Sequence, residues 1–339
     1  MTISPPRRPR SAPRYSKPVL FILCAAFIVL WSSGFVGAKY GLDHAGTFTL
    51  LFWRYLLVVA VLGLLVTLMR QWRPLTRAEW TRHAVIGALA HAGWLAAVLG
   101  AIDLGLSAGL AAFITALQPI MTGALSARMT GERVGYREWA GLVLGVGAVA
   151  LVIGDGIALG GPLAAYALPF LAVAAITIAS LVDRAAHVAC DAQAAKPATP
   201  LLFVTFIHAL ASLAVLAPLA VGLEGLEAQW GGELVFAIIW LGLVVSLAAY
   251  GLMFALLRRL PAARVASLTY LAPPVTMVIA WFVFRESLTP MAALGLVIAA
   301  MAVALTLSGR QAVAVGNDDG ASPLTEEPDP VVRRNASTA

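Results

Sequence analysis

The chain has 339 residues, of which 60% are hydrophobic and only 12% are charged, with a formal net charge of +6. A soluble domain is roughly 45–50% apolar and about 25% charged, so this composition excludes an ordinary soluble fold. The basic residues fall in short breaks between apolar runs rather than along one face, which argues against nucleic-acid binding and indicates membrane topology instead.

Ten apolar runs follow a basic, proline-rich arm at residues 1–18, and each can cross roughly 30 Å of hydrocarbon as a helix. In the first half they lie near 19–39, 47–69, 83–103, 107–127 and 138–154. In the second half they lie near 162–182, 200–221, 233–257, 263–285 and 290–308. Residues 309–339 are polar and are predicted to be a disordered tail. The sequence therefore predicts an all-α integral membrane protein with ten transmembrane helices.

Lysine and arginine are concentrated in alternate breaks between the runs. With the N-terminus inside, the segments on the cytoplasmic side hold 20 of the 23 Lys and Arg residues. Lys39, Arg54 and Arg285 lie on the outer side, where the breaks carry Asp and Glu instead. Because positive loops stay in the cytoplasm, this asymmetry supports ten spans, with the arm and the tail both cytoplasmic.

Two parts of the sequence repeat at a constant offset. Residues 107–119 (SAGLAAFITALQP) align without a gap with residues 261–273 (PAARVASLTYLAP), an offset of 154. The same offset pairs Glu132 with Glu286 and residues 141–151 with 295–305. Spans four and five thus repeat as spans nine and ten. Since five is odd, we predict two inverted-topology five-helix repeats, at 19–155 and 162–308, as in many secondary transporters.

An ordered set of motifs resembles the drug/metabolite transporter superfamily, specifically the EamA type with two EamA repeats. The motifs are WSSGFVGAKYG (31–41), FWRYLL (52–57), the prolines Pro119, Pro273 and Pro274, the repeated glutamates, and ALLRRLPAARVASL (255–268). The resemblance covers roughly residues 19–308. It implies an inner-membrane carrier with a central cavity between the repeats, commonly exporting amino acids or other metabolites.

Polar and aromatic side chains inside the spans are the candidates for substrate binding, because polar groups in hydrocarbon are costly unless they face a cavity or a partner. The candidates are Trp31, His91, Trp94, Thr115, Gln118, Tyr250, Thr269 and Tyr270. Thr115, Gln118 and Thr122 share one helix face, and Thr115 is related to Thr269 by the repeat. The structural alternative is that the threonines bond to their own helix carbonyls and Gln118 to a neighbouring helix.

Charged residues near the span ends have simpler explanations. Arg54 lies just inside the outer end of span two, where it could snorkel or hold an anion; the resemblance places it on a peripheral helix and favours a structural role. Glu132 and Glu286 precede spans whose N-terminal dipoles they would complement. A cavity of hydroxyls, one amide, one imidazole and aromatic rings, without a strong fixed charge, suits a zwitterionic or neutral metabolite.

No carboxylate lies in the middle of a predicted span. A proton-coupled carrier usually needs a protonatable group there, which leaves His91 and, on a more peripheral helix, His208. We therefore expect either facilitated diffusion or proton exchange through His91.

Enzyme signatures are weak. Gly145, Gly147 and Ala150 spell GxGxxA inside an apolar span, where helix packing explains them better than a nucleotide site. Ser33 and His91 lack an oxyanion-hole pattern for a protease pair.

We expect no catalytic residue, cofactor, metal or nucleic-acid partner. The expected partners are a small-molecule metabolite and the lipid bilayer, with a homodimer left open; the alternative function is a membrane-embedded enzyme or scaffold without transport.

Overall fold

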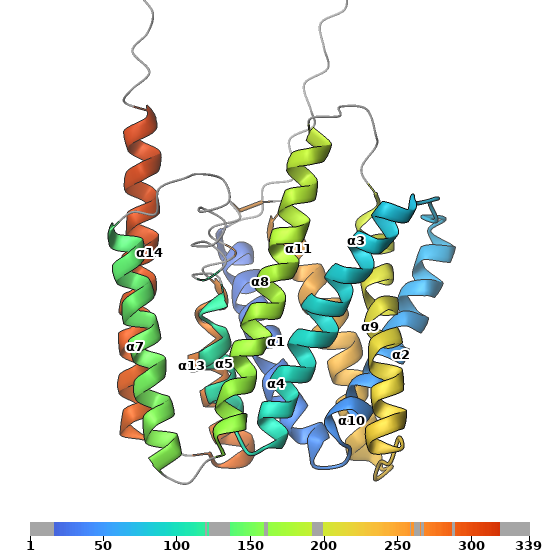
Figure 1. Ribbon diagram of the computed structural model, residues 1–339, viewed down its shortest axis with the longest axis horizontal. Helices are drawn as coiled ribbons and strands as arrows, with labels where there is room; N and C mark the ends of the chain where they lie inside the picture. Colours follow the sequence, from blue (N-terminus) through green and yellow to red (C-terminus); the bar gives the residue numbers. More distant parts are fainter. Residues whose placement is uncertain are drawn as a thin grey trace, which may run out of the picture.

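The computed structural model describes residues 17–118, 121, 136–158, 162–191, 199–257, 259–260, 265, 268–286 and 289–318. These residues form helices and one isolated β-bridge between Ala45 and Ala228. The helices lie side by side in a single bundle (Figure 1). The prediction of an all-α protein is confirmed for this part of the chain.

The elements of the first half are α1 (Lys17–Leu42), α2 (Thr47–Leu68), α3 (Arg77–Gly87), η1 (Ala88–Gly93), α4 (Trp94–Asp103), α5 (Ala108–Thr115) and α7 (Tyr136–Ala158). Those of the second half are α8 (Leu163–Asp191), α9 (Leu201–Glu224), α10 (Gly232–Ile239), η2 (Trp240–Ala249), α11 (Tyr250–Leu257), α13 (Ala272–Phe284) and α14 (Pro290–Asp318). The η segments are π-helical turns. Each joins its two neighbours into one long rod.

Within the described part of the chain, six helical segments are long and apolar enough to cross a membrane. They are Pro18–Leu42, Thr47–Leu68, Arg77–Asp103, Leu163–Asp183, Leu201–Glu224 and Gly232–Leu257, and they match predicted spans one, two, three, six, seven and eight. Predicted spans five, nine and ten correspond to the shorter apolar helices Trp139–Val152, Ala272–Phe284 and Pro290–Ala302, and span four to α5. The chain is a multi-pass membrane protein, whereas ten crossings and the inverted pairing stay predictions.

Two helix boundaries differ from the predicted ones. Predicted span nine is interrupted: residues 265, 268 and 269 are helical, residues 270–271 form a turn, and helix α13 begins at Ala272. Prolines lie in its first turn, where the missing N–H removes no helical hydrogen bond. Helix α14 continues past 308 to Asp318. Residues 310–315 contain neither Gly nor Pro, so nothing in them ends the helix. The predicted tail thus starts as helix, while Pro119, Thr122 and Glu132 lie outside the described residues.

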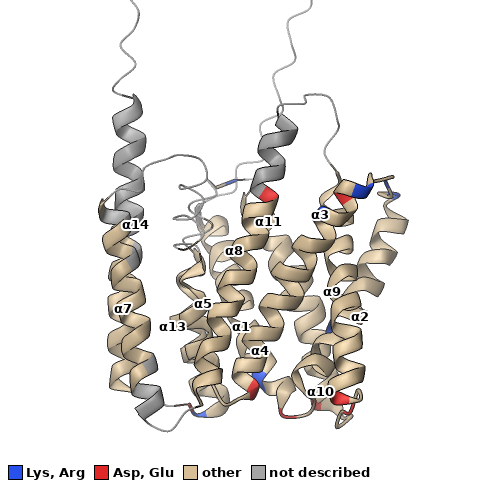
Figure 2. Ribbon diagram, in the orientation of Figure 1, with Lys and Arg blue, Asp and Glu red and all other residues tan. Residues whose placement is uncertain are grey.

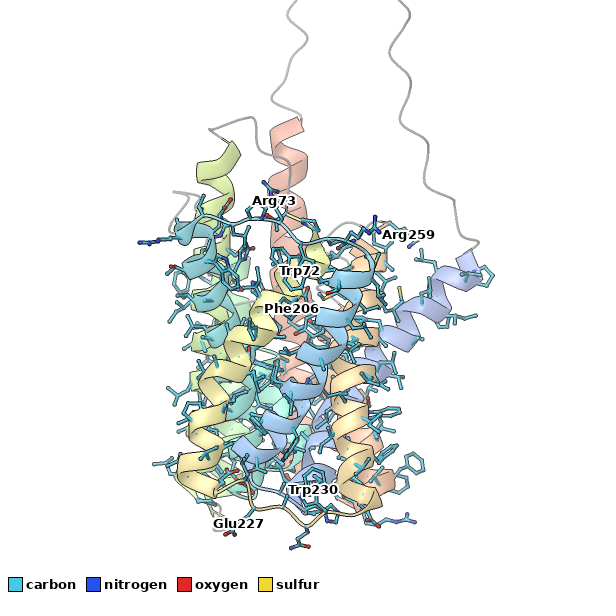
Figure 3. The ribbon with its side chains drawn as sticks, turned by 90° about the vertical axis from the view of Figure 1, so that its right-hand side faces the viewer. Trp72, Arg73, Phe206, Glu227, Trp230 and Arg259 are labelled. Atoms are coloured by element: carbon cyan, nitrogen blue, oxygen red, sulfur yellow. The ribbon has the colours of Figure 1, made fainter. Side chains whose placement is uncertain are left out.

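Charge is distributed unequally between the two ends of the bundle. Figure 2 shows most of the acidic residues at the lower end and a basic group beside the start of α3 at the upper end. Figure 3 shows Arg73 and Arg259 at one end, and Glu227 and Trp230 at the other. This separation agrees with the asymmetry that the sequence predicts.

The packing places α1 at the meeting point of the two halves. Helix α1 contacts α13, α10 and η2, while α2 packs against α9 and α7 packs against α14 at one edge of the bundle (Figure 1). Apolar side chains such as Leu50, Leu99 and Leu241 are almost completely buried in the main core cluster. Helices from both halves therefore surround the middle of the bundle.

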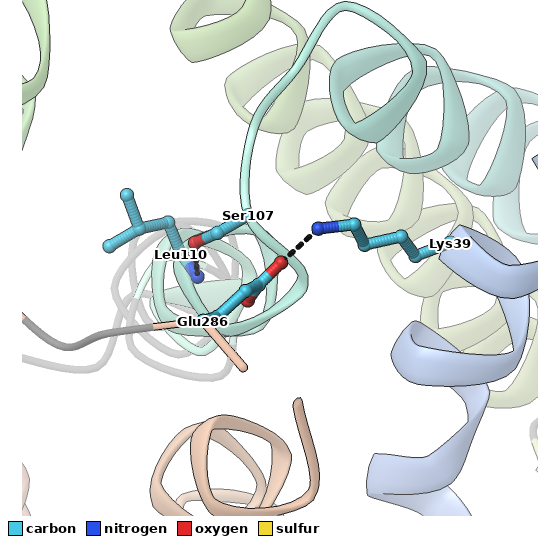
Figure 4. Close-up of polar contacts among 4 residues, drawn as sticks. All are labelled: Lys39, Ser107, Leu110 and Glu286. Atoms are coloured by element: carbon cyan, nitrogen blue, oxygen red, sulfur yellow. Dashed lines mark hydrogen bonds and ion pairs between the residues drawn. The ribbon is translucent and has the colours of Figure 1, made fainter. Parts of the chain in front are cut away.

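Polar contacts at the acidic end tie distant segments together. Lys39 at the end of α1 forms an ion pair with Glu286, in the connection between α13 and α14 (Figure 4). Ser107 caps α5 by accepting a hydrogen bond from the Leu110 backbone N–H at 3.2 Å (Figure 4). Glu286 was expected to complement a helix dipole; its carboxylate instead neutralises a lysine, which joins the first half of the chain to the second.

Candidate substrate-binding site

A pocket lies between the helices of the two halves. It is lined from the first half by Trp31, Gly34, Phe35, Ala38, Arg54, Tyr55, Val58, His91, Trp94, Leu95, Val98 and Leu99, and from the second half by Thr205, Ala209, Val245, Ser246 and Tyr250. Its cavity volume of about 60 Å³ holds several water molecules, because one water needs roughly 10–15 Å³ on this scale. Most of the lining is apolar or aromatic, with a few polar groups, as is typical of small-molecule sites.

The two π-helical segments both reach this pocket. Segment η1 contributes His91 and segment η2 contributes Val245 and Ser246. Adding the sequence offset of 154 to Ala88–Gly93 gives residues 242–247, which fall inside η2. Wide turns of this kind are rare and occur frequently at functional sites. Segments η1 and η2 occupy corresponding positions in the two halves of the sequence. Both lie in the middle of their rods, so this part of the fold shapes the pocket.

Arg54 is the charged residue among the described residues that line the pocket, and only 4% of its surface is exposed. Its Nε and Nη2 donate to Ser246 Oγ at 3.1 and 2.9 Å. Ser246 donates its own hydroxyl proton to the Leu241 carbonyl at 2.9 Å, so its oxygen is oriented to accept from Arg54. The hydrogen bond across α2 and η2 holds the guanidinium in one position.

Among the residues that the structure describes, no carboxylate lines the pocket to balance this guanidinium. Within the described residues, Arg54 Nη1 has no hydrogen-bond partner, although the Tyr55 ring lies 5.9 Å from Arg54 Cζ. A buried arginine is costly unless it is paired and its donors are satisfied. The arrangement therefore provides a fixed positive charge with free N–H donors in an apolar pocket.

Aromatic rings form a continuous wall around the same space. Trp31 and Tyr250 have ring centroids 5.3 Å apart, and Tyr250 and His91 are 5.9 Å apart. Phe35 packs edge-on against Trp94 with centroids 6.4 Å apart. Such rings offer apolar surface and negative π faces, which can contact both an apolar solute body and a cationic group.

Four of the eight predicted site residues lie together in this pocket: Trp31, His91, Trp94 and Tyr250. Thr115 is buried and donates to the Ala111 and Ala112 carbonyls of its own helix, which is the structural alternative foreseen for it. Gln118, Thr269 and Tyr270 are half-buried and do not line this pocket, so their role stays a prediction.

The sequence interpretation gave Arg54 a structural role on a peripheral helix and expected no fixed charge in the cavity. The structure places its guanidinium in the pocket wall instead. The rule that ionisable residues in hydrocarbon mark functional sites would have identified Arg54. Tyr55 and Ser246 were also missed, because one aromatic and one serine among many carry no signal in the sequence.

A multi-pass helical bundle with a binding pocket between its two halves is the architecture typical of a secondary transporter. A family model described as the EamA-like transporter family matches residues 16–154 and 166–308 of the chain. The chain therefore belongs to the EamA-like transporter family, and the two matches confirm the predicted pair of EamA repeats. This family consists of transporters rather than enzymes.

Comparison with curated proteins finds no match. Among solved structures, 25 chains match. One of them, titled only "Crystal structure of protein", is 17% identical over 86% of this chain and 98% of its own, with a TM-score of 0.57. This likeness shows a shared fold alone.

Proposed function

We propose that the protein is an inner-membrane secondary transporter that exports a small metabolite such as an amino acid. The observation that carries the proposal is the pocket between the two repeats, whose wall holds the Arg54 guanidinium with no carboxylate partner among the described lining residues. The end of the bundle that carries Arg73 and Arg259 would face the cytoplasm, following the positive-inside rule. The family supports a transport function, and the pocket supports a site for its substrate.

The chemistry of the pocket favours a substrate that carries a carboxylate. A guanidinium pairs with a carboxylate through parallel N–H···O bonds, and this pairing is strongest where water is excluded. Ser246 occupies Nε and one side of Nη2, which leaves Nη1 for the ligand. None of the described lining residues is acidic, so an ammonium would rest on the faces of Trp31 or Trp94.

Alternating access would move the two repeats against each other about this pocket. The contact surface between α1 and the second half is built from glycines, which suits such a movement. A Cβ on Gly34 would lie 3.0 Å from Val245, and one on Gly37 would lie 3.1 Å from Trp240. Smooth, small-residue faces let membrane helices approach closely and slide without side-chain interlocking. We therefore place the moving interface between α1 and the rod that contains η2.

Counterflow in proteoliposomes tests the proposal. Vesicles are loaded with an unlabelled mixture of amino acids and diluted into a radiolabelled mixture of the same composition, with protein-free vesicles as the control. We expect saturable uptake of label above the control. If amino acids, sugars and amines all give only the protein-free signal, the alternative of an enzyme or scaffold without transport replaces this proposal.

A further inference from the structure

Three histidines form a chain that leads away from the pocket. His91 lines the pocket, and its ring centroid lies 5.7 Å from that of His208 on α9. His208 Nε2 lies 3.3 Å from Nδ1 of His83 on α3, with ring centroids 5.4 Å apart. His83 is two turns from the start of α3, which follows the loop of Arg70 and Arg73 at the basic end (Figure 3).

Close packing of α3 against α9 holds these rings together. A Cβ on Gly87 would lie 2.6 Å from the carbonyl oxygen of His208, so only glycine permits this approach. Ser212, one turn after His208, donates to the Gly87 carbonyl at 3.0 Å. Helix α9 crosses the rod of α3 and η1 at Gly87, which lies between His83 and His91 in the sequence. The crossing therefore places His208 between these two histidines in space.

The hydrogen bonds determine where the protons of the chain lie. Arg82 Nη2 is 3.3 Å from Nε2 of His83, and because a guanidinium only donates, this nitrogen must accept. The proton of neutral His83 is then on Nδ1, which donates to Nε2 of His208. His208 in turn keeps its proton on Nδ1. The hydrogen bonds therefore all donate in one direction, from Arg82 to His83 and from His83 to His208.

We propose that His83, His208 and His91 form a proton route between the basic end of the bundle and the substrate pocket, which couples transport to proton movement. The inference rests on the proposed transport function. An imidazole can accept a proton on one ring nitrogen and release one from the other, and intramembrane histidine chains serve as relays in pumps and transporters. The charged and titratable groups on elements packed around the chain are Arg54 and Tyr55 on α2, Tyr250 on α11, Arg82 on α3 and Asp183 on α8.

Each transfer conserves protons along the route. Arg82 swings away from Nε2 of His83, which takes up a proton from the basic end. His83 then releases its Nδ1 proton to Nε2 of His208, and His208 releases its own Nδ1 proton to His91 at the pocket. Release of the extra proton from His91 into the pocket, followed by rotation of the imidazoles, restores the starting arrangement. The positive charge of Arg54 opposes a second charge in the pocket, so a bound carboxylate that neutralises Arg54 favours arrival of the proton.

Counterflow and gradient-driven uptake separate this route from the substrate site, because counterflow needs no net proton movement. Proteoliposomes with a pH gradient and a radiolabelled amino-acid mixture measure accumulation. We expect His208→Gln and His83→Gln to lose gradient-driven accumulation while keeping counterflow, since neither side chain lines the pocket. His44→Gln, in the turn after α1, is the matched control and should keep both activities. Accumulation retained in His208→Gln overturns the route.

A second measurement decides the question without any substrate. Deuterium exchange at the imidazole C2 carbon, followed by mass spectrometry, reports the titration of each histidine in the purified protein. We expect His83→Gln to shift the titration midpoint of His208. Absence of exchange at both His208 and His91, or a His208 midpoint unaffected by His83→Gln, removes the route. Absence of counterflow in the wild-type protein, by contrast, removes the proposed function.

Discussion

Replacement of Arg54 by glutamine tests the assignment of the carboxylate site most directly. The change removes the positive charge and the guanidinium donors that face the pocket but keeps a polar side chain near Ser246. A hydrogen bond to a charged group contributes about 1.5–3 kcal/mol net, after the water that both partners lose has offset part of its strength. Loss of about 2–3 kcal/mol corresponds to a rise of roughly 30- to 150-fold in the half-saturation concentration for counterflow, at about 1.4 kcal/mol per tenfold.

The substrate side of the same pair provides an internal check. Methyl esters of the amino acids lack the carboxylate, so they should compete poorly in the wild-type protein and lose little further in Arg54→Gln. Arg54→Lys keeps a point charge without the planar fork and should lie between the two. Arg285→Gln is the matched control, because Arg285 is exposed in the connection between α13 and α14. A half-saturation concentration unchanged in Arg54→Gln refutes the carboxylate site.

Three further changes probe the groups that support the pocket. Ser246→Ala removes the acceptor that orients Arg54 and should raise the half-saturation concentration by about tenfold, as expected for a loss of about 1.4 kcal/mol; an unchanged value contradicts this role. Gly87→Ala should lower the melting temperature in detergent, although alanine favours helix, because its Cβ would collide with the His208 backbone. Gly147→Ala is the control, because the space around Gly147 is open, and it should not lower the melting temperature. The Glu224 carboxylate accepts from two backbone N–H groups at the start of α2, at 2.7 and 3.0 Å. Glu224→Gln removes its charge and one acceptor, and should cost about 0.5–2 kcal/mol of stability. An unchanged melting temperature counts against this cap.

The residues of the candidate site that could be predicted from the sequence are those of types that are rare inside membrane spans. Trp31, His91, Trp94 and Tyr250 are large or titratable groups inside apolar runs, and the structure brings all four to one pocket. The threonines were less informative, because a hydroxyl can bond to its own helix, as Thr115 does. A polar residue in a span therefore indicates a cavity only when its own backbone cannot satisfy it.

The sequence by itself determined the membrane class, the positions of six long spans and membership in the family. These follow from hydrophobic length, charge asymmetry and a repeat at constant offset, all of which are properties of the linear chain. The tertiary structure alone decided which faces of the helices meet. In a membrane helix both the lipid-facing and the buried face are apolar, so the sequence contains little information on rotation about the helix axis.

That ambiguity explains why the sequence predicted peripheral positions for Arg54 and His208. The resemblance implied a peripheral helix for Arg54, and only the crossings of α2 with η2 and of α3 with α9 turn these two side chains inward. The second crossing depends on Gly87, a residue that looks unremarkable among 30 glycines. The linear pattern shows that a chain crosses the membrane, but close backbone contacts decide which side chains meet inside it.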